Sequence, residues 1–369
     1  METAPKHRGS WKEFLKRKQI NFTVQTYFID ALGAMAQGLF CSLLIGTIIK
    51  TLGQQLGMEF LIEVGGYASA MSGAAMAVAI GYALKAPPLV LFSLVTVGYA
   101  ANALGSVTLS GGSGAGGPLA VLFIAVIAAE LGKAVSKETK IDILVTPLVT
   151  ILAGVALSAW WAPAIGAAAS AFGQLIKDAT VLQPFWMGIV VSVLVGIALT
   201  LPISSAAICA AFGLTGLAGG AAVAGCCANM VGFAVLSFRE NRWGGLVSQG
   251  IGTSMLQMPN IVRNPRIWLP AILTSAVTGP IATCVFRLEM NDPASGVASG
   301  MGTCGLVGQI GVYSGWVNDV ATGVKAAITP FDWLGLILIS FVLPAVLCWA
   351  FGLFFRRIGW IKEGDLTLS

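Results

Sequence analysis

The chain has 369 residues, of which 56% are hydrophobic and only 10% carry charge, and its mean hydropathy is +0.85. Soluble domains carry about 25% charged residues, so this composition excludes a water-soluble globular domain and predicts an all-α integral membrane protein in contact with the lipid bilayer. The formal net charge of +5 is no signature of nucleic-acid binding, because the lysines and arginines lie beside the apolar segments. No nucleic-acid partner is predicted.

Residues 1–24 are predicted to form a cytoplasmic amphipathic lead-in. Trp11, Phe14 and Leu15 share one helix face, and lysines and an arginine surround them. A basic amphipathic helix of this kind lies in the membrane interface with its apolar face toward the lipid.

Apolar runs then recur along the chain, and a run of roughly 17–25 residues crosses a bilayer. They predict about ten spans, at 25–49, 62–84, 87–108, 117–134, 141–161, 184–201, 203–217, 219–237, 267–288 and 331–355. Because lysine and arginine mark the cytoplasmic side, both termini are expected in the cytoplasm. Residues 25–200 would form a scaffold-rich half, and 331–369 the last span and tail. Residues 162–180 would lie along the outer interface or connect the two halves.

Residues 201–330 contain a repeated break. Residues 250–254 and 300–304 both read G-x-G-T followed by a small residue. In lipid, irregular backbone persists only where it is buried in protein or lines a watery cavity, and paired breaks of this kind indicate a transporter's binding site. The segments that carry them, 246–257 and 293–317, predict two re-entrant hairpin-like segments. They are expected to enter from opposite faces, so that the two breaks meet near the middle of the membrane.

Neutral hydroxyl and amide side chains surround the two breaks. Both groups donate and accept hydrogen bonds, which suits a neutral polyol such as a sugar, whereas freed backbone N–H groups would suit an anion. The residues predicted to bind substrate are Ser204, Ser205, Asn229, Gln249, Thr253, Ser254, Gln257, Asn260, Thr303 and Gln309. For each of them a second interpretation is a hydrogen bond between membrane helices.

Catalysis, metal binding and cofactor binding are not predicted. The only histidine is His7 in the basic lead-in, and the seven cysteines lie almost entirely in apolar segments, where they are interpreted as buried free thiols. Small residues between Gly216 and Gly225 permit close helix packing and predict a homodimer. Asn260, Arg263 and Asn264 are an alternative docking face or gate on the cytoplasmic side.

Four stretches of the second half are distinctive. They read LPISSAAI at 201–208, GCCANMVGFAV at 225–235, QGIGTSMLQMPNIVRNPRIWLP at 249–270 and GMGTCGLVGQIG at 300–311. With them the chain resembles, over nearly its whole length, the membrane family that includes the perfringolysin O regulator proteins. That family is grouped with the enzyme IIC components of the bacterial sugar phosphotransferase system.

The resemblance implies a phosphotransferase-permease-like, elevator-type transporter in the bacterial inner membrane. It further implies a homodimer, a mobile part whose hairpins hold the sugar, and a cytoplasmic IIB phosphocarrier as partner. Glucose-type permeases place a glutamate and a histidine at the sugar. Here the apolar segments contain no histidine, and Glu240 is the only glutamate in 201–285, so phosphorylation coupling and substrate stay open.

The function predicted from the sequence is a multi-pass permease for a small polar solute, a sugar or sugar derivative. It would work by alternating access, with residues 201–330 as the mobile substrate-binding region. One alternative is a secondary carrier for a small organic acid, held by Thr253, Ser254 and hairpin N–H groups. An alternative of another class is a membrane sensor that regulates gene expression through the basic lead-in and residues 238–266.

Overall fold

The fold is helical throughout the part of the chain that the structure describes. The structure is a computed structural model that describes residues 11–107, 116–291 and 296–368. Apart from isolated bridge residues, such as the pair Gly216 and Met290, every regular element in these residues is a helix. Seven helices are long and apolar enough to cross a membrane, or eight if the bent pair Glu59–Ala70 and Ser72–Ala83 is one span. The all-helical, multi-span fold is therefore confirmed, whereas the number of ten spans is not.

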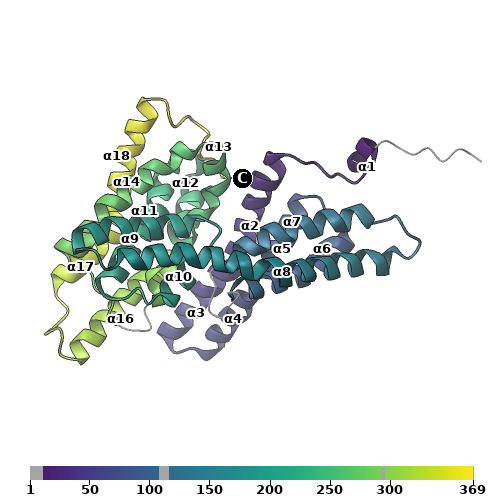
Figure 1. Ribbon diagram of the computed structural model, residues 1–369. Coiled ribbons are helices and arrows are strands. Elements are labelled where there is room, and N and C mark those ends of the chain that lie inside the picture. Colours follow the sequence, from purple (N-terminus) through teal and green to yellow (C-terminus); the bar gives the residue numbers. More distant parts are fainter. Residues whose placement is uncertain (1–10, 108–115, 292–295, 369) are drawn as a thin grey trace, which may run out of the picture.

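The first half of the chain forms one bundle (Figure 1). It begins with α1 (Trp11–Arg17) in the predicted lead-in, where the membrane-interface location stays a prediction. One continuous helix follows, made of η1 (Gln25–Asp30), α2 (Ala31–Leu39), η2 (Phe40–Leu44) and α3 (Ile45–Leu56). Helix α4 (Glu59–Ala70) pairs with α3, and the bundle is completed by α5 (Ser72–Ala83), α6 (Pro88–Gly105), α7 (Gly117–Val135) and α8 (Asp142–Ala179).

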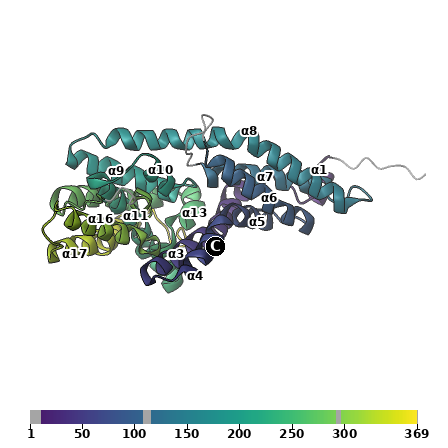
Figure 2. The ribbon, with the colours of Figure 1, turned by 90° about the horizontal axis from the view of Figure 1, so that it is seen from below.

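Helix α8 joins the two halves. It has 38 residues and is therefore about 57 Å long at 1.5 Å per residue. Figure 2 shows it running along both bodies. Residues 162–179 thus continue the helix begun at Asp142, and Gly173 of this part packs against the ring of Phe212. Of the two interpretations for this stretch, the packing agrees with a connection between the halves.

The second half forms another bundle around α11 (Gly216–Leu236), which is almost entirely buried. The other elements are α9 (Pro184–Thr200), α10 (Ser205–Ala211), α12 (Phe238–Val247), η3 (Ser248–Gly252), η4 (Ser254–Gln257), α13 (Met258–Arg263), η5 (Pro265–Trp268), α14 (Leu269–Pro280), η6 (Ile281–Val285), α15 (Gly296–Ser299), η8 (Cys304–Leu306), α16 (Val307–Ala321), α17 (Pro330–Ile337), η9 (Leu338–Val342) and α18 (Leu343–Arg357). Helices α9, α14 and α18 pack directly on α11.

The span predicted at 203–217 is wrong. The only helix there is α10, whose seven residues are about 10 Å long, against about 30 Å of hydrocarbon. The chain leaves the helix at Gly213, where φ is +61°, and turns again at Gly216, where φ is +59°. Glycine adopts this left-handed conformation at no steric cost, so the apolar run is interrupted although its composition is continuous.

The small residues from Gly219 to Gly225 are buried inside the protein. A Cβ atom on Gly220 would overlap the Leu288 carbonyl oxygen, and one on Gly225 would overlap the Ser192 carbonyl oxygen. These glycines let α11 approach α9 and the segment after η6. Residues 219–225 are therefore covered by the same chain and do not offer a dimer surface; the homodimer itself stays a prediction.

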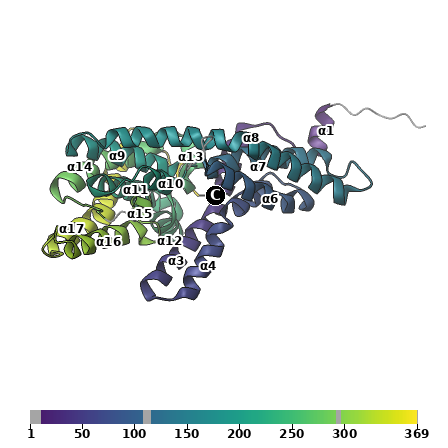
Figure 3. The same ribbon diagram turned by 60° about the horizontal axis from the view of Figure 1, so that its bottom comes forward.

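Helices α3 and α4 form an arm that projects from the junction of the two bundles (Figure 3). Their backbones meet closely, since a Cβ on Gly46 would lie 2.8 Å from the Gly65 carbonyl oxygen. The base of this arm, where η2 passes into α3, is also the surface on which the two G-x-G-T breaks rest.

Candidate functional site

The two G-x-G-T breaks touch each other. Thr303 Oγ1 of the second donates a hydrogen bond of 2.5 Å to the Gly250 carbonyl oxygen of the first. The first break separates η3 from η4, and the second lies between α15 and η8. The contact between the two breaks, which the placement of charges along the sequence predicts, is thus present in the structure.

Close packing around the breaks depends on glycine. At Gly302 φ is +54°, and a Cβ there would lie 2.5 Å from Cys226 Cβ on the buried helix α11. A Cβ on Gly252 would overlap the ring of Phe40 in η2. The breaks are therefore packed between α11 and the long helix formed by residues 25–56.

A cavity of about 70 Å³ lies where the two halves meet beside the breaks. The second half contributes Ser204, Ser205 and Thr253, and no lining residue is charged. The first half contributes apolar side chains, namely Leu39, Leu43, Leu44 and Pro118. Ligand sites usually measure about 300–1,000 Å³, so this cavity is well below the usual size of a ligand site.

The hydroxyls at the cavity also hold local structure. Ser204 caps α10 by accepting a hydrogen bond from Ala207 N at 3.2 Å. Ser205 Oγ donates to the Gly300 carbonyl oxygen at 2.7 Å, which ties α10 to the second break. Thr253 Oγ1 accepts from Met255 N at 3.1 Å and its residue is 3% exposed. Since a hydroxyl can donate as well as accept, Thr253 keeps a donor for a bound solute.

Asn229 is the centre of a buried polar network on the other side of the first break. Its Oδ1 accepts from Trp268 Nε1 at 3.0 Å and from Thr200 Oγ1 at 3.2 Å. Its Nδ2 donates to Ser275 Oγ at 3.2 Å, and the hydroxyls of Thr200 and Ser254 are 2.8 Å apart. These groups satisfy one another between α9, α11, α14 and η4, which is the helix-to-helix interpretation of Asn229 and Ser254.

Three predicted amides form a ladder that leads away from the cavity. Gln249 Nε2 donates to Ser237 Oγ at 2.8 Å. Gln257 Nε2 donates to Gln249 Oε1 at 2.9 Å, and Asn260 Nδ2 donates to Gln257 Oε1 at 2.8 Å. All three residues are buried, so the ladder is part of the protein interior in this conformation.

The ladder binds the C-terminal segment of the chain itself. Gln257 Nε2 donates to the Leu366 carbonyl oxygen at 3.0 Å, and Asn260 Nδ2 donates to that of Thr367 at 2.9 Å. Asn241 and Asn264 hold the same segment, with bonds to the backbone of residues 360, 366 and 368. Leu366 is fully buried in the largest apolar core.

This C-terminal contact was missed from the sequence. The available signal was a run of amides, Asn241 to Asn264, opposite the isolated apolar residues Ile361 and Leu366 of a polar tail. A docking face or gate at Asn260, Arg263 and Asn264 stays a prediction; the segment that Asn260 and Asn264 hold here belongs to the same chain.

Gln309 lies apart from the cavity. Its Nε2 donates to Ser340 Oγ at 2.9 Å and to Cys227 Sγ at 3.3 Å. Among the described residues, no group donates to its buried Oε1. The structure therefore gathers Ser204, Ser205 and Thr253 at the cavity, with Thr303 beside the first break, and places the other predicted residues in networks between helices.

Comparison with known proteins gives one family. A family model described as "Phosphotransferase system, EIIC" matches residues 29–368. No curated protein and no solved structure matches the chain significantly.

Proposed function

The chain belongs to the enzyme IIC family of the phosphotransferase system, and on that premise we propose that it moves a neutral sugar across the membrane by alternating access at the cavity between its two halves. Membership makes it a transmembrane sugar permease and implies a IIB partner. The substrate, the mode of coupling and the moving parts are what the proposal adds.

The cavity carries the proposal. It lies where the two bundles meet, and it is lined by three hydroxyl side chains, Ser204, Ser205 and Thr253, without any charged residue. Hydroxyls can exchange hydrogen bonds with sugar hydroxyls in both directions. A carboxylate would find no cation there, which favours a neutral sugar over an organic acid.

Transport requires the cavity to open, because about 70 Å³ is well below the size of ordinary ligand sites, about 300–1,000 Å³. The residues 201–330 would move against the first bundle in an elevator-type step. Helices α9 and α18 pack on α11, so we propose that they move with it. Rigid-body motion of one body against the other is typical of alternating access.

The phosphoryl group would come from the IIB partner. The cavity lining offers no carboxylate or imidazole that could act as a proton acceptor. In this proposal the protein presents the sugar, and the base and phosphoryl donor belong to the partner or to the sugar's cytoplasmic surroundings.

Thermal-shift measurements on the purified protein test the substrate class. A ligand that binds only the folded state stabilises it by about 2.7 kcal/mol at 100 times its Kd. We expect at least one neutral mono- or disaccharide to raise the melting temperature, and sugar acids and small carboxylates to leave it unchanged. Stabilisation by carboxylates alone would replace this proposal with an organic-acid carrier.

A further inference from the structure

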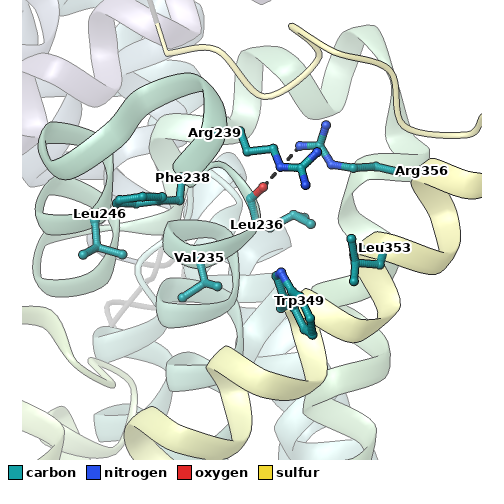
Figure 4. A pocket seen from close by; sticks show the side chains of 9 residues that line it. Val235, Leu236, Phe238, Arg239, Leu246, Trp349, Leu353 and Arg356 are labelled. Carbon is teal, nitrogen blue, oxygen red and sulfur yellow. Dashed lines mark hydrogen bonds between the residues drawn. The ribbon is translucent and has the colours of Figure 1, made fainter.

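A second pocket lies between the end of α11, the start of α12 and the last turns of α18 (Figure 4). Its volume is about 270 Å³, so it is larger than the cavity between the halves. Its walls are mostly apolar and its rim carries two arginines, Arg239 and Arg356.

The rim has more positive than negative charge. Figure 4 shows the guanidinium groups of Arg239 and Arg356 extending toward each other. Arg356 Nη2 donates to Glu240 Oε1 at 2.8 Å and to the Leu236 carbonyl oxygen at 3.2 Å. Within the described ranges, Arg239 has no hydrogen bond or ion pair through its side chain. Glu240 thus pairs with one of the two guanidinium groups, and guanidinium binds phosphate oxygens with favourable geometry.

The walls suit a hydrocarbon chain. Val235, Leu246, Trp349 and Leu353 line them, and Trp349 is 54% exposed. Helix α18 is the last part of the continuous apolar helix Pro330–Arg357, which is long enough to cross the membrane. Basic residues occupy its last turn. Tryptophan is enriched at membrane interfaces, and basic pockets between spans on the cytoplasmic side bind anionic headgroups.

We propose that this pocket binds an anionic phospholipid, with the headgroup phosphate between Arg239 and Arg356 and an acyl chain against Trp349 and Leu353. The pocket connects α18 to the start of α12. Ser237, which accepts the hydrogen bond from Gln249, lies between two residues that line it. A bound lipid would therefore hold the last span against the segment that leads to the first break.

Native mass spectrometry of the detergent-purified protein tests this proposal, with phosphatidylglycerol as the anionic probe and phosphatidylcholine as the zwitterionic one. We expect preferential binding of phosphatidylglycerol. Arg239→Gln should weaken it about tenfold, the effect of losing roughly 1.4 kcal/mol of charge-assisted hydrogen bonding. Arg357→Gln removes the same charge from an exposed position outside the pocket and should leave binding unchanged.

Two further measurements distinguish binding in this pocket from general attraction to positive charge. Leu246→Trp keeps both arginines and fills part of the apolar wall, so it should also weaken phosphatidylglycerol binding. Inorganic phosphate at millimolar concentration should compete poorly, because it lacks the acyl chain; full competition would assign the rim to free phosphate and overturn the lipid proposal. Equal binding of the two lipids, or equal effects of Arg239→Gln and Arg357→Gln, would also overturn it.

Discussion

Gly302→Ala is expected to prevent the protein from folding into a stable, monodisperse form, whereas Gly250→Ala in the first break is expected to be tolerated. At Gly302 φ is +54°, and a Cβ would lie 2.5 Å from Cys226 Cβ and 3.0 Å from Cys226 C. The left-handed conformation costs alanine about 1–2 kcal/mol, and overpacking a tight interior adds about 1–3 kcal/mol. Helix α11 cannot retreat, because it is buried on nearly all sides.

Gly250 is a matched control from the same motif. A Cβ there meets only Ala234 Cβ at 3.5 Å, an ordinary contact, and its φ is not left-handed. Size-exclusion profiles and melting temperatures of the two variants measure the difference. Equal stability of Gly302→Ala and the unmodified protein would contradict the contact between the second break and α11. An equal loss of stability in both variants would mean that Gly302 and Gly250 do not differ in how tightly their surroundings are packed.

Leu366→Ala is expected to destabilise the protein by about 2–5 kcal/mol, the usual range for removing a buried leucine side chain. Leu366 is 0% exposed in the core shared by both bundles, and its carbonyl oxygen accepts hydrogen bonds from Asn241 and Gln257. Loss of its packing would also loosen these amides, and an unsatisfied buried polar group costs about 1–3 kcal/mol.

Leu368→Ala is the matched control for the C-terminal contact. Leu368 is only partly buried and lies two residues further along the same segment. Its substitution should cost less than about 1 kcal/mol, in the range of surface changes. Thermal unfolding in one detergent compares the two variants directly. If Leu366→Ala has the same melting temperature as Leu368→Ala and the unmodified protein, the segment does not occupy this buried position.

The sequence predicted the features that follow from local composition. Long apolar runs predicted helices, and the two G-x-G-T breaks stood out because glycine and threonine interrupt those runs. Charge placement predicted that the breaks meet, and the bond between Thr303 and Gly250 agrees with it. The family resemblance to enzyme IIC permeases is confirmed by the match over residues 29–368; the link to perfringolysin O regulators stays a prediction.

Other features depend on partners far along the chain. Hydropathy predicts a span at 203–217 because it carries no information on backbone conformation. The left-handed glycines Gly213 and Gly216 interrupt the helix there. Gln257 and Asn260 bind a segment more than 100 residues away. The residues next to an amide do not indicate whether its side chain is free or hydrogen-bonded to a distant backbone segment. Only the packed structure separates Thr253, at the cavity, from the amide ladder beside it.

The most direct test of the account is the affinity of purified Thr253→Val for the sugar that stabilises the unmodified protein. Removing the hydroxyl leaves a buried sugar group without a partner, which costs about 1–3 kcal/mol, so isothermal titration should show binding weaker by at least about fivefold. Thr253→Ser retains the hydroxyl that accepts from Met255 N and should bind within about twofold. Unchanged affinity in the valine variant, with the fold intact, would contradict the sugar site proposed between the two halves.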